Sequence, residues 1–168
     1  MASRPAAGAP RSASSERAEA GWEDFLVCYR SLRRELATVV ERHGMMLSEF
    51  RALQYLAEGS APLGQLAAHL GLTPATLTTL ARGLRARGWA RSTTDPRDRR
   101  RELLSATAQG RAVCRRARAD YLVRLGEIAE RIPGPEREAL LQGLGALRTV
   151  LASAPATPAG GGSPTRGR

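Results

Sequence analysis

Apolar positions along most of the chain recur at helical spacing. Between residues 16 and 43 they return every three or four positions, which predicts a helix that ends near Gly44. The members of this stripe are Trp22, Phe25, Leu26, Tyr29, Leu32, Leu36, Val39 and Val40. A second helix is expected to begin after Ser48 as its N-cap and to end near Gly59. Its apolar face holds Phe50, Leu53 and Leu56.

Two short helices are predicted next, over residues 63–72 and 73–88. The first breaks at Gly71, and the second begins with Thr73 as N-cap, has a proline at its first position and ends at Gly88. Two helices joined by a short turn that contains glycine match the helix-turn-helix motif. The second helix is expected to turn one apolar stripe inward: Leu77, Leu80, Ala81 and Leu84.

The segments "WARSTT" (89–94) and "RELLSA" (101–106) are predicted to pair as a two-stranded hairpin. Thr107 is expected to cap a long helix that runs to about residue 131, where "IPGP" breaks it before a last amphipathic helix over 136–152. Residues 1–15 and 154–168 are rich in Ala, Pro, Gly and Ser without periodicity, so both are predicted to be disordered tails. The fold class expected is therefore mostly α with a small β-hairpin.

The positive charge of the chain indicates the kind of molecule that it binds. All 26 cationic residues are arginines, and the formal net charge is +10. Residues 82–118 hold twelve arginines against three acidic residues, so nine of those ten charges lie there. Such a basic stripe is typical of a nucleic-acid binder. No apolar run reaches the length of a membrane span and the first residues lack the apolar middle of a secretory signal, so we expect a cytoplasmic protein without a membrane partner.

The segment "DPRDRRR" (95–101) lies between the two predicted strands and holds four arginines and two aspartates. A charged loop set on a hairpin directly after a helix-turn-helix is typical of a wing. It would direct arginines toward a phosphate backbone or a minor groove, namely Arg97, Arg99, Arg100 and Arg101. Asp95 and Asp98 are expected to hold these arginines in place as ion pairs. The alternative is a loop that only aids solubility.

The helix over 74–87 is the candidate recognition helix. Its outward face presents Ala75, Thr76, Thr79 and Arg82, with Thr73 and Thr78 alongside. Threonine can bond several bases or contact a thymine methyl, and arginine can bond guanine through two hydrogen bonds. The alternative is that a threonine-rich first turn only caps the helix.

The stretch "LTPATLTTLARGLRARGWARSTTDPRDRRRELLSATAQGR" resembles the winged helix-turn-helix signature of MarR-type transcriptional regulators. The specific pattern is Asp-x-Arg followed by Leu-x-apolar-Thr-x-x-Gly. It is met by Asp98, Arg100, Leu104, Ala106, Thr107 and Gly110. The resemblance covers about residues 20–152. Two departures are Gly83, where family members often carry arginine, and Ala106, which replaces a larger apolar residue.

The resemblance implies a homodimer that places its recognition helices in successive major grooves of a palindromic operator. It also implies that Arg100 enters the minor groove and that Asp98 orients it. Dimerisation is then assigned to the helix over 16–44 and the helices over 108–153, and DNA binding to 45–107. Wide apolar faces on the flanking helices agree with a dimer. A monomeric helical bundle is the alternative.

Control by a small phenolic or aromatic ligand, or by cysteine oxidation, is a further implication of the resemblance. A ligand cleft is expected between the first helix, the helix with Phe50 and Tyr55, and the winged domain. Its candidate residues are Trp22, Arg30, Arg34, His43, Met46 and Tyr55. For the aromatic and methionine residues the alternative is ordinary core packing. Cys28 is a candidate redox residue because Arg30 is near, and a buried inert thiol is its alternative.

Other chemistries find little support in the sequence. Cys28 and Cys114 are too few and too far apart for a disulfide framework or a zinc site, and the two histidines stand alone, so no metal or cofactor is predicted. We find no paired catalytic carboxylates, phosphate-binding glycine loop or nucleophile–histidine set, and we do not expect an enzyme. The function predicted is a sequence-specific, ligand-released DNA-binding regulator, with repression expected. A redox-sensing regulator acting through Cys28 and a non-specific architectural DNA-binding protein are the alternatives.

Overall fold

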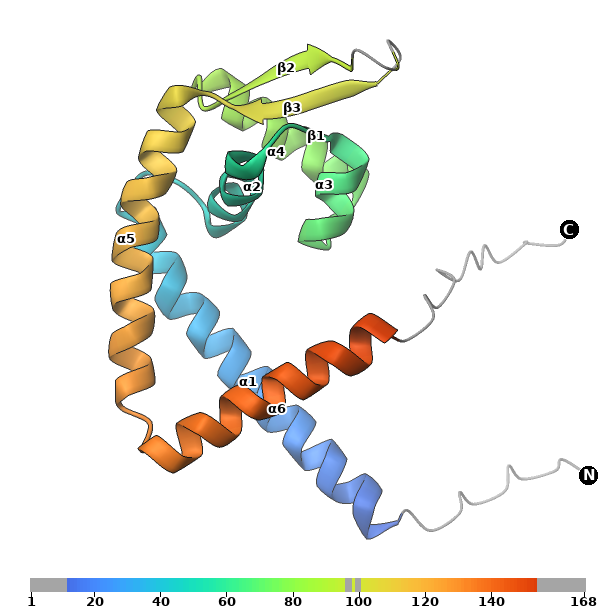
Figure 1. Ribbon diagram of the computed structural model, residues 1–168, viewed down its shortest axis with the longest axis vertical. Helices are drawn as coiled ribbons and strands as arrows, with labels where there is room; N and C mark the ends of the chain where they lie inside the picture. The colour runs from blue at the N-terminus through green and yellow to red at the C-terminus, as the bar shows by residue number, and fades with distance from the viewer. Residues whose placement is uncertain (1–11, 96–97, 99–100, 154–168) are drawn as a thin grey trace, which may run out of the picture. The chain divides into compact units, whose positions relative to one another are not determined.

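The computed structural model describes residues 12–95, 98 and 101–153, and over them it is mostly helical with one small antiparallel sheet (Figure 1). The fold class expected from the sequence is confirmed. The elements, in chain order, are α1 (Ala13–Glu41), α2 (Leu47–Glu58), β1 (Ala61–Pro62), α3 (Leu63–Leu70), α4 (Pro74–Ala86), β2 (Ala90–Thr94), β3 (Glu102–Ala106), α5 (Ala108–Glu130) and α6 (Gly134–Ser153). Ser12 is the N-cap of α1 and residues 13–15 lie in its first turn, whereas the rest of the two predicted tails lies outside the described residues.

The chain divides after Leu125 into two units. The first contains α1 to α4, the sheet and most of α5, and the second contains the end of α5 and α6. The core of the first unit draws on α2, α3, α4 and the sheet, with Phe50, Leu53, Leu66, Leu77 and Leu84 among its most buried side chains.

The start of α2 differs from the prediction. The helix begins at Leu47 with Met46 as its N-cap, so Ser48 lies inside the first turn and is not the cap. The backbone N–H of Met46 donates to the Glu49 carboxylate at 2.8 Å. The glutamate three residues after the cap thus accepts from the N–H of the cap residue, which is the second half of a capping box.

The helix-turn-helix is confirmed as α3 and α4. Gly71 ends α3 in the left-handed conformation, at φ 65° and ψ 34°. The Thr73 hydroxyl accepts from the backbone N–H of Thr76, and Pro74 holds the first helical position. The predicted inward stripe of α4 is buried: Leu77, Leu80, Ala81 and Leu84.

The sheet has the order β1-β3-β2, and both neighbouring pairs are antiparallel. The predicted hairpin is confirmed, with a register from Ala90 opposite Ala106 to Thr94 opposite Glu102. Strand β1 was not expected, because a two-residue strand that includes Pro62 leaves no alternating pattern in the sequence. It adds to the free edge of β3, with Ala61 opposite Leu104.

The junction between the hairpin and α5 explains the Thr-x-x-Gly pattern. The Thr107 hydroxyl donates to the Gly88 carbonyl at 2.6 Å and accepts from the Gly110 N–H at 3.0 Å. The Thr107 N–H donates to the Trp89 carbonyl at 2.9 Å. A Cβ on Gly110 would stand 2.0 Å from that same carbonyl oxygen, so only glycine fits here.

Gly110→Ala is therefore expected to lower the free energy of unfolding by roughly 1–3 kcal/mol or more, because the new methyl overlaps backbone that cannot move aside. Gly64→Ala in α3 is the matched control, since its Cβ would meet nothing within 4 Å. That change is expected to be neutral or to stabilise by up to about 1 kcal/mol. Chemical denaturation measures both. Equal midpoints for the two variants would contradict the close approach at Gly110.

Candidate functional site

The exposed face of α4 carries every residue that the sequence assigned to DNA contact on this helix, and all six are exposed: Thr73, Ala75, Thr76, Thr78, Thr79 and Arg82. Three of the threonine hydroxyls are engaged locally. Thr73 and Thr76 share a hydrogen bond of 2.8 Å, and Thr78 donates to the Pro74 carbonyl at 2.9 Å. In the described part of the chain, the side chains of Thr79 and Arg82 have no hydrogen-bond partner. They are the groups of this face most available to a ligand.

Arg85 links α4 to the hairpin, a role that the sequence did not reveal. Its guanidinium donates to the Ser92 hydroxyl of β2 at 2.7 Å and to the Glu102 carboxylate of β3 at 2.5 Å. Ser92 and Glu102 lie on different strands, so one side chain connects the candidate recognition helix to both strands. The two candidate DNA-contact elements are thus coupled directly.

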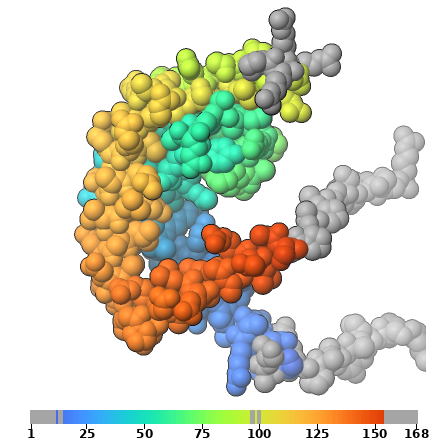
Figure 2. All heavy atoms as spheres, viewed as in Figure 1, coloured from blue at the N-terminus to red at the C-terminus, as the bar shows by residue number. Residues whose placement is uncertain are grey.

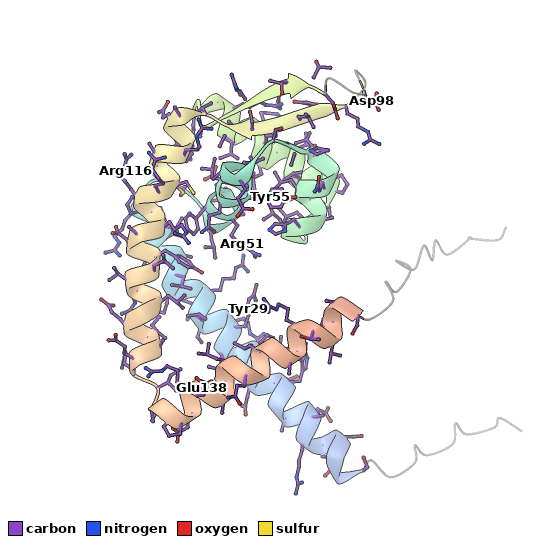
Figure 3. The ribbon with its side chains drawn as sticks, viewed as in Figure 1. Tyr29, Arg51, Tyr55, Asp98, Arg116 and Glu138 are labelled. Atoms are coloured by element: carbon purple, nitrogen blue, oxygen red, sulfur yellow. The ribbon has the colours of Figure 1, made fainter. Side chains whose placement is uncertain are left out.

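The wing tip is described in part. The Arg101 guanidinium lies 3.3 Å from the Asp98 carboxylate, and the Arg101 N–H donates to the Asp98 carbonyl at 2.9 Å. Asp98 therefore contacts an arginine, as expected for an aspartate of this loop. Figure 3 shows Asp98 at the far end of the hairpin, and Figure 2 shows the hairpin at one edge of the first unit, beside the first turns of α5.

The remaining wing candidates, Arg97, Arg99 and Arg100, lie outside the described residues. The orientation of Arg100 by Asp98 and its entry into a minor groove stay predictions.

The C-terminal end of α4 is held by Arg87. Its guanidinium donates to the Gly44 carbonyl, lies 3.5 Å from the Glu49 carboxylate and stands 4.7 Å from the centre of the Trp89 ring. Glu49 is the one charged residue that is buried in the described chain. A Cβ at Gly83 would meet that same carboxylate at 3.6 Å. Gly83 therefore lies beside Glu49, the same carboxylate that Arg87, one turn later, contacts.

A cleft of about 570 Å³ lies in the first unit, where α1, α2, the turn after α3 and α5 come together. Its lining residues are Tyr29, Leu32, Arg33, Leu36, Leu47, Ser48, Arg51, Leu70, Gly71, Leu72 and Tyr121. None of the six predicted effector residues lines it. A second hollow of about 470 Å³ shares Arg33, Leu47 and Ser48 with the cleft, and it includes three of the six: Arg30, Arg34 and Met46.

The other three predicted effector residues contact neighbours elsewhere. Trp22 is exposed on α1 and stacks on Phe25 at 5.4 Å between ring centres. His43 shares a hydrogen bond of 2.8 Å with Asp120 of α5. Tyr55 packs against the His69 ring at 4.3 Å. Asp120 lies far from His43 in the sequence, so no local pattern indicated this partner.

Tyr121 and Arg51 give the cleft its chemistry. The Tyr121 ring packs on Phe50 at 5.2 Å between centres. Burial raises the pKa of the Tyr121 phenol, and the neighbouring Arg51 guanidinium partly opposes that shift. A phenol on an apolar wall with an arginine beside it suits an aromatic or acyl group that bears a negative charge.

The two cysteines differ in accessibility. Cys28 is exposed on α1, whereas Cys114 is buried in α5. Burial raises the pKa of the Cys114 thiol, against the opposing effect of Arg118 and Arg115. Within the ranges that the structure describes, no three His, Cys, Asp or Glu side chains gather in a way that could hold a metal ion. The described helices include none with the length and hydropathy needed to cross a membrane.

Apolar side chains remain exposed on both units. On α6 they are Leu140, Leu141, Leu144, Leu147, Val150 and Leu151. No residue of α6 is buried. On α1 and α5 they include Trp22, Phe25, Val27, Tyr29, Leu122 and Val123. Exposed apolar side chains gathered on helices in this way are typical of an interface with another protein surface.

A sequence model described as "MarR family" matches residues 43–101. The resemblance inferred from the sequence is thereby confirmed. A search of curated proteins found no match to the chain.

Solved structures share the fold. A probable transcriptional regulator from Pseudomonas aeruginosa is 26% identical, with a TM-score of 0.61 over 71% of this chain and 93% of its own. The transcriptional regulator BldR from Sulfolobus solfataricus is 21% identical, with a TM-score of 0.72 over 83% of this chain and 99% of its own.

CouR from Rhodococcus jostii RHA1 was solved with p-coumaroyl-CoA and is 24% identical, with a TM-score of 0.67 over 80% of this chain and 94% of its own. The repressor CouR on a 23-mer DNA duplex gives 23% identity and a TM-score of 0.68 over 74% of this chain and 89% of its own.

The contrast between the cysteines predicts two rates of thiol labelling. With an aromatic disulfide reagent at neutral pH, Cys28 is expected to react about tenfold faster than Cys114 or more, because Cys114 reacts only after local opening. The fast phase should vanish in Cys28→Ser and persist in Cys114→Ser. Raising the pH should speed both phases, because the thiolate is the form that reacts in each case. Equal rates in the two variants would contradict the burial of Cys114.

Proposed function

Because residues 43–101 match the winged helix-turn-helix of the MarR family, we propose that this protein is a homodimeric, sequence-specific DNA-binding regulator. In this proposal it represses transcription from a palindromic operator and a small-molecule effector releases it. The observation that carries the proposal is the exposed face of α4, linked to the wing hairpin by the contacts of Arg85 with Ser92 and Glu102. A helix and a wing that are coupled in this way can contact a duplex as one surface.

The chemistry of this surface suits the major groove. Thr79 and Arg82 project from α4, and the methyl of Ala75 lies on the same exposed face. Arginine can form hydrogen bonds with guanine, and threonine can form them with several bases. The methyl groups of alanine and threonine can pack against the methyl group of thymine. The arginines of segment 95–101 then serve the phosphates or the minor groove, in keeping with the positive charge of residues 82–118.

A dimer is supported by the exposed apolar faces. The exposed leucines of α6 and the exposed rings of α1 would be covered by a second copy. A two-fold dimer would place two α4 helices about one turn of DNA apart, which accounts for a palindromic operator.

Effector control is supported by the position of the cleft next to the start of the recognition helix α4. Its wall includes Leu70, Gly71 and Leu72, the turn that directly precedes the Thr73 cap of α4. A ligand that prefers one arrangement of this turn would shift the position of the recognition helix, and so change the affinity for DNA. That CouR was solved both with p-coumaroyl-CoA and with DNA supports this pairing of ligand and duplex.

Arg100→Ala tests the wing. On a duplex that the protein selects from a random pool, this variant is expected to bind about 1–3 kcal/mol more weakly, and the slope of log K against log salt should fall by about one unit. Arg17→Ala is the matched control, because it removes the same charge near the start of α1, outside the helix-turn-helix and the hairpin. Fluorescence anisotropy at several salt concentrations measures both. Unchanged affinity in Arg100→Ala would show that the wing makes no such contact.

Arg82→Ala and Thr76→Ala test the recognition helix. We expect each variant to change the preference among half-site variants, because these side chains face the base edges and not only the phosphates. Competition binding with a set of single-base substitutions gives the ranking of half-sites. If all duplexes weaken by the same factor, this face of α4 contacts only the backbone of the DNA.

A further inference from the structure

The wing hairpin has a buried base and an exposed outer half. On the face that the hairpin turns toward the core, Ala90, Leu104 and Ala106 are buried at the base. Ser92 and Glu102 continue this face, because side chains two positions apart on a strand point to the same side, and both are exposed. Apolar packing on this face therefore supports the base of the hairpin and ends before Glu102.

Arg85 supplies a polar contact where the apolar packing ends. Its guanidinium donates to the Ser92 hydroxyl at 2.7 Å and to the Glu102 carboxylate at 2.5 Å. Arg85 lies in the last turn of α4, whereas Glu102 is the first residue of β3 and directly follows Arg101 of the wing tip. The point at which the segment 95–101 rejoins the sheet is thus tied to the recognition helix.

Neither stability nor charge accounts for the presence of Glu102. The side chains of Arg85 and Glu102 are 36% and 45% exposed, and an ion pair between side chains this exposed adds little to the stability of a fold. Glu102 is also one of only three acidic residues in residues 82–118, which hold twelve arginines. A carboxylate on a surface that approaches DNA repels the phosphates. Glu102 therefore weakens DNA binding unless its contact with Arg85 provides a larger gain.

We propose that Arg85 and Glu102 are positioning residues, which hold the wing where it can contact the same duplex as α4. This inference rests on the proposed function, in which α4 and the wing bind DNA together. It adds that an acidic residue, Glu102, strengthens specific binding of DNA. A wing that is already in place loses little conformational freedom on binding, whereas a loose wing has to be ordered at the expense of affinity.

Glu102→Ala separates positioning from simple charge. On a duplex that the protein selects from a random pool, this variant is expected to bind about fivefold to tenfold more weakly than the wild type, although it removes a negative charge. On a scrambled duplex it should bind as tightly as the wild type or more tightly, because phosphate contacts suffice there. Fluorescence anisotropy measures both affinities, and the ratio of the two Kd values gives the specificity.

Glu58→Ala is the matched control. Glu58 is an exposed acidic residue at the end of α2, and within the described ranges its side chain forms no hydrogen bond or ion pair. Its removal changes the charge of the first unit by the same amount as Glu102→Ala does. Simple electrostatics predicts that both variants bind the selected duplex at least as tightly as the wild type. Positioning predicts this for Glu58→Ala alone.

Exchange of the two charges tests for rescue. Arg85→Glu alone should lose at least as much affinity as Glu102→Ala, because two carboxylates then face each other. The double variant, Arg85→Glu with Glu102→Arg, keeps the net charge and restores an ion pair, so it is expected to bind within about threefold of the wild type. If Arg85 acted only by direct contact with a phosphate, this exchange would not restore binding. Chemical denaturation checks that the midpoint of the double variant stays close to that of the wild type.

A Glu102→Ala variant that binds the selected duplex as tightly as Glu58→Ala does would overturn the inference. So would a double variant that stays as weak as Arg85→Glu alone. The wild type distinguishes this inference from the proposed function. If the wild type enriches a duplex and Glu102→Ala binds it normally, only the positioning role is wrong. If the wild type enriches no duplex, the proposed function itself fails.

Discussion

The contact between the Trp89 carbonyl and the first turn of α5 is the constraint on which the DNA-facing surface depends. The Thr107 N–H donates to this carbonyl, while the Thr107 hydroxyl donates to the Gly88 carbonyl and accepts from the Gly110 N–H. Glycine at position 110 leaves room for the Trp89 carbonyl to approach. The end of α4, the base of the hairpin and the start of α5 consequently meet at one point. A larger residue at position 110 would push the Trp89 carbonyl away from α5 and so shift the base of the hairpin relative to α4.

The two ends of α4 are held in different ways. At its C-terminal end Arg85 contacts the two strands, and Arg87 contacts Glu49 and the Gly44 carbonyl. At its N-terminal end the turn through Gly71 forms part of the cleft wall. The helix is therefore held firmly to the wing, while the turn before it borders a space that a ligand can fill. That arrangement suits a protein whose DNA affinity responds to a small molecule.

Local sequence patterns predicted the helices, the helix-turn-helix and the hairpin. Apolar spacing and helix caps such as Thr73 depend only on residues that are close together in the sequence. Features that depend on distant partners were not predictable in this way. The Met46 cap depends on a buried Glu49 that Arg87 approaches, and His43 meets Asp120 across 77 positions. The cleft residues Arg51 and Tyr121 share no motif. Their meeting follows only from how α2 and α5 pack.

Selection of bound duplexes from a random DNA pool tests the central claim most directly, namely that α4 and the wing read sequence as a two-fold pair. The account predicts enrichment of a palindrome with half-sites about 10 base pairs apart, centre to centre. It also predicts a Kd at least about a thousandfold lower for that palindrome than for a scrambled duplex at the same salt concentration. A pool without enrichment, and a ratio of the two Kd values near one, would contradict it and favour a non-specific architectural protein.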